Sequence, residues 1–304
     1  MQQKDTVGRL QPGNLLKKCL ALGVILFGCF LLRASFFTRM HISELLREIN
    51  KGLVSAQYIG FERLYGKYSV VYYPRGEEDA ARLVQAAAEK FFPQVAAEFR
   101  LDLKRREPVV VYRQQRELNR FFGWPADEGT MGVYWAGTIR VLSPNAWIPE
   151  TDAAAVRETF FNSGPMVHEA VHLAVDYRTR GNYPRWLTEG LAQEFERRLT
   201  GFAFDPPEGP FSWYPFEALD GFDYLPDQHL AYYQSLLMVQ YLYRLGGSAK
   251  IAALIEDMGR GLSFTQAMSN NFGYNITEFE AKWREWVDKD GVQAPNKIYQ
   301  TKTI

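Results

Sequence analysis

The stretch Pro165-Met-Val-His168-Glu169-Ala-Val-His172, followed by Trp186-Leu-Thr-Glu189-Gly190, is the part of the chain around which we expect the fold to be built. His168 and His172 are four residues apart, so on a helix they lie on one face and can bind one metal ion. Glu169 lies about 100° further round, where its carboxylate reaches a water bound to that ion. Neutral imidazole nitrogen suits zinc, and a third protein ligand leaves a fourth position for water. Glu189 is the best candidate for that ligand.

An ordinary surface helix with two unrelated histidines is the alternative explanation of this pattern. The chain has only four histidines, and two of them fall here. Apolar residues surround them on nearly every side, at Met166, Val167 and 173–175, which predicts a buried helix. Buried histidines and a buried glutamate are costly without a metal or polar partners. We therefore favour the metal site.

Length and composition are those of a globular chain with a sizeable core. The 304 residues suffice for one large domain or two small ones, and 47% of them are hydrophobic. The formal net charge is zero, so nothing indicates a nucleic-acid partner. The two cysteines, Cys19 and Cys29, both lie near the N-terminus, so we expect neither a disulfide nor a thiolate metal site in the rest of the chain.

The N-terminal region predicts a membrane anchor. Residues 1–18 are polar and end in two lysines, and residues 19–32 form an uninterrupted apolar run. Arg33 can snorkel to the interface, which allows residues 19–37 to span a bilayer. We expect an uncleaved, single-pass signal anchor in the cell inner membrane, with 1–18 as a cytoplasmic tail and the main domain extracytoplasmic, periplasmic or extracellular. A cleaved signal peptide and a buried helix of a soluble protein are the alternatives.

Residues 38–150 predict a linker helix followed by a small sheet. In the linker, 38–64, apolar residues between His41 and Leu53 recur at helical spacing. The sheet part, 65–150, has β-branched and aromatic runs that predict strands at 69–73, 108–112 and 132–142. Helices are expected at 77–101, with a kink or break at Pro93, and at 116–122.

Residues 151–290 predict a mainly helical part, and 291–304 a polar tail. Ser163 can cap the helix that starts at Pro165. An irregular loop of functional length is expected at 202–228. The expected helices are 152–161, 165–177, 184–199, 229–245, 250–259, 263–272 and 277–287. The predicted class is α+β: a small mixed sheet packed on a mainly helical lobe, preceded by one transmembrane helix.

The two metal-site segments together resemble a known family. His168-Glu-Ala-Val-His172 followed by Trp186-Leu-Thr-Glu189-Gly190-Leu-Ala resembles the gluzincin branch of zinc metallopeptidases. The segments are most similar to small bacterial peptidase-MA-like domains and more distantly to the catalytic core of the aminopeptidase N family. Tyr232-Tyr-Gln-Ser-Leu236 is similar to the helix that carries a catalytic tyrosine in such enzymes. The resemblance covers about residues 65–290 and implies a zincin catalytic lobe.

This resemblance implies a hydrolase that cleaves peptide bonds of a peptide or protein substrate with a zinc-activated water. Three side chains would hold the Zn²⁺: His168, His172 and Glu189. Glu169 would be general base to the water and then proton donor to the leaving amine. Tyr232 would donate a hydrogen bond to the oxyanion, with Tyr233 and His229 as alternatives.

Two further sets of residues are expected near the metal. Glu196 follows Glu189 by seven residues on one helical face, and the family has an acidic residue there that would fix the tautomer of a ligand histidine. Asp176 is an alternative, although solvation at a helix end explains it equally. Four residues would form an edge strand that binds substrate, or else an internal core strand: Tyr134, Trp135, Ala136 and Gly137.

One departure from the aminopeptidase group narrows the expected activity. That group recognises a free amino terminus with a Gly-x-Met-Glu-Asn segment, and residues 124–164 contain nothing like it. An endopeptidase is therefore a better expectation than an aminopeptidase. The alternative function is an inactive zinc-binding domain that serves as a membrane-tethered binding module, and the presence of Glu169 favours catalysis instead. Nothing in the sequence indicates an oligomeric state.

Overall fold

The computed structural model describes residues 36–126, 129–208 and 210–291. The predicted cytoplasmic tail lies outside these ranges, as do nearly all of the predicted anchor at 19–37 and of the polar C-terminal tail at 291–304. Among the described residues, no helix has the length and apolar character needed to cross a membrane.

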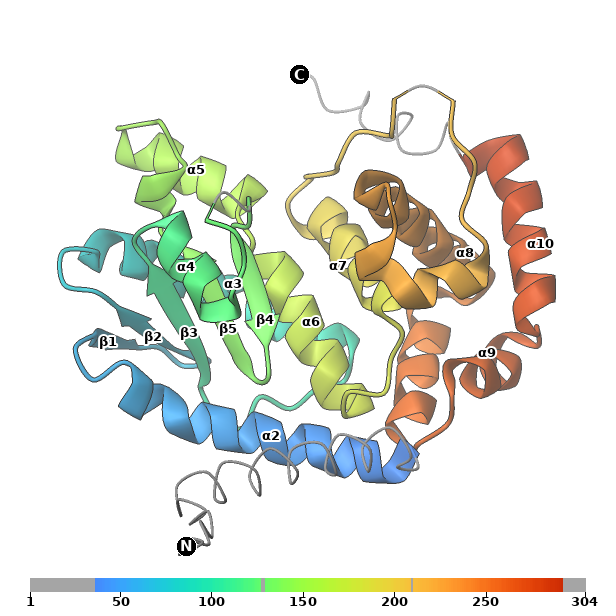
Figure 1. The fold of residues 1–304 in the computed structure, drawn as a ribbon, viewed down its shortest axis with the longest axis horizontal. Helices are drawn as coiled ribbons and strands as arrows, with labels where there is room; N and C mark the ends of the chain where they lie inside the picture. The colour runs from blue at the N-terminus through green and yellow to red at the C-terminus, as the bar shows by residue number, and fades with distance from the viewer. Residues whose placement is uncertain (1–35, 127–128, 209, 292–304) are drawn as a thin grey trace, which may run out of the picture.

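A five-stranded mixed sheet forms one side of the molecule, with strand order β1-β2-β3-β5-β4 (Figure 1). The strands are β1 (Glu62–Tyr65), β2 (Ser69–Tyr73), β3 (Glu107–Tyr112), β4 (Gly132–Trp135) and β5 (Thr138–Leu142). The three central strands β2, β3 and β5 are parallel, whereas β1 and β4 pair antiparallel at the two edges. The central strands are buried along their whole length because helices cover both faces. The predicted strands are confirmed, and the short, largely exposed β1 is an addition.

Four helices cover the sheet. On one face lie α3 (Glu78–Glu98) and α6 (Met166–Thr179), and on the other lie α2 (Phe36–Gln57) and α4 (Gln115–Phe122). Of the predicted kink or break at Pro93, the break does not occur, because α3 continues through that residue. A proline inside a helix costs about 3 kcal/mol, whereas burial of one large apolar side chain contributes about 1.5–3 kcal/mol. The buried Phe91, Phe92 and Val95 around Pro93 therefore outweigh the lost hydrogen bond.

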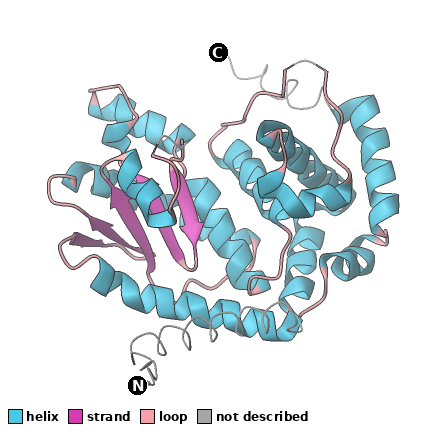
Figure 2. Ribbon diagram, in the orientation of Figure 1, coloured by secondary structure: helices cyan, strands magenta, loops and turns pink. Residues whose placement is uncertain are grey.

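The second side of the molecule is helical, so the chain has a mixed α+β fold with helix predominating (Figure 2). Its helices are α7 (Arg185–Leu199), α8 (Gln228–Gly259), α9 (Phe264–Phe272) and α10 (Ile276–Trp286). Helix α5 (Ala153–Ser163) lies on the sheet side, where it packs on α3 (Figure 1). Three short helical segments complete the described chain: η1 (Pro144–Ala146), η2 (Phe216–Tyr224) and η3 (Val287–Gly291). Ser163 ends α5 and does not cap α6, whose first residue follows Pro165. Two predicted helices join in α8 across Gly247, whose φ is 63°.

Helix α2 packs on the domain, where the sequence predicted only a linker. Its buried side carries Met40 and Val54 together with two polar residues, Arg47 and Asn50. The Arg47 guanidinium lies 3.1 Å from the Asp176 carboxylate of α6, and Asn50 donates a hydrogen bond to the carbonyl of Ala136. Helix α2 is therefore attached both to α6 and to the turn between β4 and β5.

Candidate metal centre

Helix α6, which carries His168 and His172, lies between the sheet and the helical side of the molecule (Figure 1). Pro165 precedes its first residue, where a missing N–H leaves no unsatisfied donor. The side chains next to the two histidines on this helix, among them Val167 and Val171, are buried in the core. The two imidazole rings lie next to each other with centroids 4.7 Å apart, as residues one turn apart on a helix do.

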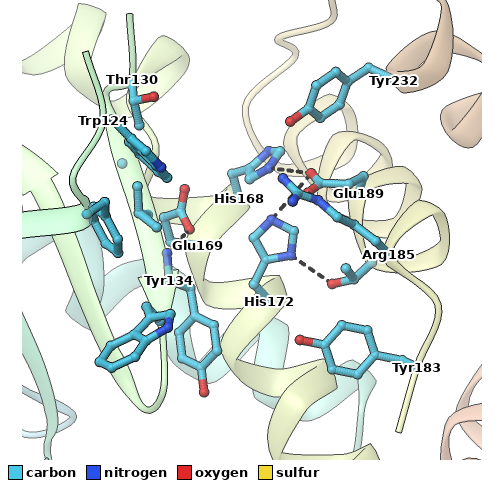
Figure 3. Close-up of a pocket in the computed structure, with 15 residues that line it drawn as sticks. Trp124, Thr130, Tyr134, His168, Glu169, His172, Tyr183, Arg185, Glu189 and Tyr232 are labelled. Atoms are coloured by element: carbon cyan, nitrogen blue, oxygen red, sulfur yellow. Dashed lines mark hydrogen bonds and ion pairs between the residues drawn. The ribbon is translucent and has the colours of Figure 1, made fainter. Parts of the chain in front are cut away.

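Helix α7 brings Glu189 to the two histidines. The carboxylate Oε2 of Glu189 lies 3.2 Å from Nε2 of His168 and 3.5 Å from Nε2 of His172 (Figure 3). All three ligand atoms lie within 4.8 Å of one another. Two imidazole nitrogens and one carboxylate oxygen match the donor set of a catalytic zinc site with an open position. The residues therefore fit a bound zinc ion.

Side chains of α7 contact each of these three ligands through an atom that does not face the centre of the cluster. Glu196, predicted to orient a ligand histidine, lies with Oε2 3.0 Å from Nδ1 of His168. The hydroxyl of Thr188 lies 2.7 Å from Nδ1 of His172. The Nε–H of Arg185 donates to Oε1 of Glu189 over 3.2 Å, which leaves Oε2 directed at the histidines. Such contacts fix the ring orientation and the tautomer of a metal ligand.

The charges of the cluster favour a cation at its centre. Burial alone would lower the pKa of His168, but the charge of Glu196 and hydrogen bonds to Glu189 and Glu196 hold that pKa well above 6.5. Burial alone would raise the pKa of Glu189, yet His172 and His168 keep it well below 4.5. Carboxylates directed at both imidazole rings thus suit a positive charge at the centre of the cluster.

Glu169 faces the edge strand from the same helix. Its side chain is buried, and its Oε2 accepts a hydrogen bond from the backbone N–H of Tyr134 in β4. Strand β4 approaches α6 so closely at Gly132 that a Cβ there would lie 2.6 Å from Pro165 and 3.1 Å from Glu169. Burial raises the pKa of Glu169, and the neighbouring His172 and His168 act in the opposite direction. A carboxylate with a raised pKa is suited to proton transfer near neutral pH.

A cavity of about 420 Å³ opens onto the cluster (Figure 3). The residues that line it, besides the three ligands and Glu169, are Phe122, Trp124, Thr130, Gly132, Val133, Tyr134, Trp135, Tyr183, Arg185, Thr188 and Tyr232. Of the predicted substrate strand, this lining includes Tyr134 and Trp135 but not Ala136 or Gly137. Those two residues form the turn after β4, with φ values of 44° and 79°. The turn packs on α2, which removes it from the cavity.

Of the three candidates for the oxyanion donor, the structure brings only Tyr232 to the cavity. Its ring lies across the cavity from Glu169, on the same side as Glu189 (Figure 3). Tyr233, on the adjacent side of α8, is buried against Trp213 at a ring separation of 6.1 Å. His229 is exposed and contacts the carbonyl of Asp205 at 2.7 Å.

Several residues of the site were not predicted from the sequence. Tyr183 and Trp124 lack any sequence signal, because their contacts depend on how separate segments pack. Thr188 lies inside the stretch Trp186–Gly190 but was not assigned a role. For Arg185 the sequence did contain a signal: it precedes Glu189 by four residues, about one helical turn, which is the spacing of an ion pair on a helix. The interpretation of Asp176 as a solvated helix end is wrong, because it is buried against Arg47 and accepts a hydrogen bond from the Tyr134 hydroxyl.

The mixed sheet with its edge strand, the histidine pair on α6 and the glutamate on α7 define a zincin-like metallopeptidase fold. The family model of the Peptidase MA superfamily matches residues 130–289, and the chain belongs to that superfamily. The match contains β4, β5 and all three candidate ligands. A comparison with curated proteins found no match.

Proposed function

We propose that this protein is a gluzincin-type zinc metallopeptidase that hydrolyses internal peptide bonds. One observation carries the proposal: His168, His172 and Glu189 converge within 4.8 Å on the wall of a cavity that also contains the buried Glu169. A purely structural zinc site is normally closed by four protein ligands, whereas this cluster supplies three at a cavity. The arrangement therefore favours chemistry on a bound molecule.

Each side chain then has a defined task. A zinc ion bound to the three ligands supplies Lewis-acid polarisation and acidifies water. Glu169 accepts a proton from the attacking water and returns it to the leaving amine, and its buried position raises its pKa toward the working range. The backbone N–H of Tyr134 holds that carboxylate in place. The Tyr232 hydroxyl stays protonated, because burial raises its pKa, and it donates to the scissile carbonyl oxygen.

The edge position of β4 supports an extended peptide as the substrate. Strand β4 pairs with β5 on one side only, and its other edge borders the cavity. An extended segment can add to such an edge by backbone hydrogen bonds. Residues 124–164 contain no Gly-x-Met-Glu-Asn segment that would recognise a free amino terminus, which favours an endopeptidase.

The same proposal places the enzyme at a membrane. Residues 19–37 would anchor it in the cell inner membrane, with residues 1–18 in the cytoplasm and the peptidase domain outside. The support is the apolar run that follows Lys17 and Lys18 in the sequence. Protease added to spheroplasts tests this topology, since it would digest an extracytoplasmic domain and spare a cytoplasmic one.

Replacement of one carboxylate tests the proposed activity. Glu169→Gln should abolish cleavage of a peptide library while bound zinc remains, because the amide cannot accept the water's proton. Glu117→Gln, at an exposed site on α4, is the matched control and should cleave normally. Zinc binding without cleavage by the unmodified chain would contradict the enzyme and favour the alternative, an inactive membrane-tethered binding module.

A further inference from the structure

Helix α2 presents an aliphatic ridge on the surface of the molecule. Four side chains form this ridge, and they are 59%, 52%, 49% and 50% exposed: Leu45, Leu46, Ile49 and Leu53. Their spacing puts them on one side of the helix, and Ile42 continues the row toward the N-terminus. Contiguous exposed aliphatic side chains of this kind mark an interaction surface, whereas isolated ones do not.

The orientation of α2 is unusual for an amphipathic helix. Its inward side uses Arg47 and Asn50, which bind Asp176 and the turn after β4, so the more polar side faces the domain. Lys51 on the same side donates hydrogen bonds to Glu107 and Tyr177, each over 2.8 Å. These buried polar contacts hold the helix in this orientation. The aliphatic ridge is therefore directed outward by specific contacts and is not a loosely packed part of the core.

Two observations point to a bilayer surface as the partner. The apolar run at 19–37 ends within the first turn of α2, so a bilayer that holds the run lies where α2 begins. At about 1.5 Å per residue, Leu53 is only about 25 Å further along, and the whole ridge reaches the interface if α2 lies parallel to it.

A basic segment adjoins the same helix. Lys104 and Arg105 have side chains that are 80% and 79% exposed, and Lys104 lies 3.8 Å from the acidic Asp102. The exposed Arg106 follows them, so this cluster carries a net positive charge even when Asp102 and Glu48 are included. Arg105 lies 3.4 Å from Glu48, the residue before Ile49, which fixes the basic segment beside the ridge. Cationic side chains next to an aliphatic helix face match the headgroups and acyl boundary of a membrane that contains anionic lipid.

We propose that the ridge of α2 lies on the surface of an anionic bilayer and sets the orientation of the domain on it. The inference rests on the proposed anchor at 19–37. Because the opposite side of α2 contacts both α6 and the turn after β4, this docking also fixes the direction in which the cavity faces the membrane.

Quenching of a fluorophore on the ridge tests the proposal in the full chain. Cys19→Ser and Cys29→Ser remove the native thiols, and an environment-sensitive dye is attached after Ile49→Cys or, as a control, after Glu117→Cys on α4. The chain is reconstituted into phosphatidylcholine–phosphatidylglycerol vesicles. Nitroxide lipid labelled near the headgroup should remove most of the fluorescence at 49 and leave 117 unchanged. Aqueous iodide should show the reverse.

Any other outcome contradicts the proposal, and each shows a different reason for the failure. Iodide quenching at 49 would show a ridge exposed to water, and quenching by neither agent would show a ridge covered by protein, either this chain or a second copy. A chain that does not float with the vesicles would refute the anchor itself. Leu45→Gln with Leu53→Gln should abolish the lipid quenching at 49, and a preserved circular dichroism spectrum would show that the fold is intact.

Discussion

Each histidine of the metal centre has one ring nitrogen directed at Glu189 and the other in contact with a second side chain of α7. For His168 that side chain is Glu196, at 3.0 Å, and for His172 it is Thr188, at 2.7 Å. A carboxylate that accepts the Nδ1–H of an imidazole leaves Nε2 unprotonated and makes it a stronger ligand. Glu196 is thus expected to act on the metal through His168.

The substitution Glu196→Gln isolates this effect. The amide still fills the space but carries no charge, so we expect zinc affinity to fall by about 10- to 100-fold while the fold is retained. Competition with a zinc chelator measures the affinity, with Glu117→Gln as the control. An affinity equal to that of the unmodified chain would show that Glu196 does not support His168.

The sequence predicted the two histidines of this centre but not all of the residues that line the cavity, and the difference has a physical reason. The spacing of His168 and His172 specifies a shared helix face without knowledge of any other segment. Tyr183 and Trp124 reach the cavity only through the packing of separate loops. Their contacts depend on tertiary structure that no local spacing contains.

At the scale of elements, α7 and α8 carry opposite parts of the site, and their separation is set at Gly190. A Cβ at that position would lie 2.2 Å from the carbonyl oxygen of Ser235, which belongs to the backbone of α8. The glycine thus lets the helix that bears Glu189 approach the helix that bears Tyr232. Gln193 adds a hydrogen bond of 2.8 Å to the carbonyl of Tyr232.

The substitution Gly190→Ala should force these helices apart. We expect it to lower the free energy of unfolding by about 1–3 kcal/mol and to weaken zinc binding, because a backbone atom cannot move aside as a side chain can. Gly52→Ala is the control, since a Cβ there would meet no described atom within 4 Å, and it should leave stability unchanged or slightly raised. Urea unfolding measures the free energy of unfolding of both variants. Equal stability of Gly190→Ala and Gly52→Ala would show that the close contact of Gly190 with the α8 backbone does not matter for stability.

Helices and strands were predicted well where apolar residues recur at a regular helical or strand spacing. They were predicted poorly where tertiary packing outweighs the local sequence preference. Strands 69–73 and 108–112 have β-branched runs, and the helices from 151 onward have clear helical spacing. The break that was one alternative at Pro93 does not occur, because burial of its neighbours outweighs a missing hydrogen bond. The inward side of α2 was also unexpected, since its polar residues find charged and hydrogen-bonding partners that are distant in sequence.

At the scale of the whole molecule, a buried carboxylate in the helical lobe links stability to pH. Glu194 of α7 binds Arg197 and Arg198 and accepts a hydrogen bond from Gln240 of α8. Burial alone would raise the pKa of Glu194, but Arg197, with Gln240 and Arg198, lowers it below 4.5. A lowered carboxyl pKa means that the stabilisation is complete above pH 4.5 and is lost as the pH falls through the folded-state pKa.

The substitution Glu194→Gln should therefore destabilise the protein in a pH-dependent way. At pH 7 we expect a loss of about 2 kcal/mol, from charge-assisted hydrogen bonds, and a smaller loss well below pH 4.5, where Glu194 is itself protonated. Denaturant unfolding at several pH values measures the difference. A loss that does not change with pH would show that the charge of Glu194 is not what stabilises the lobe.

The central claim is that His168, His172 and Glu189 hold zinc, and X-ray absorption at the zinc edge tests it most directly. For the full chain we predict a bound zinc with imidazole scattering, nitrogen and oxygen neighbours at about 2.0–2.2 Å and no sulfur neighbour. His172→Ala and Glu189→Ala should each remove or reshape this spectrum, whereas Glu117→Gln should not. A chain purified with zinc available that contains no zinc, or a zinc spectrum that survives both substitutions unchanged, would contradict the account.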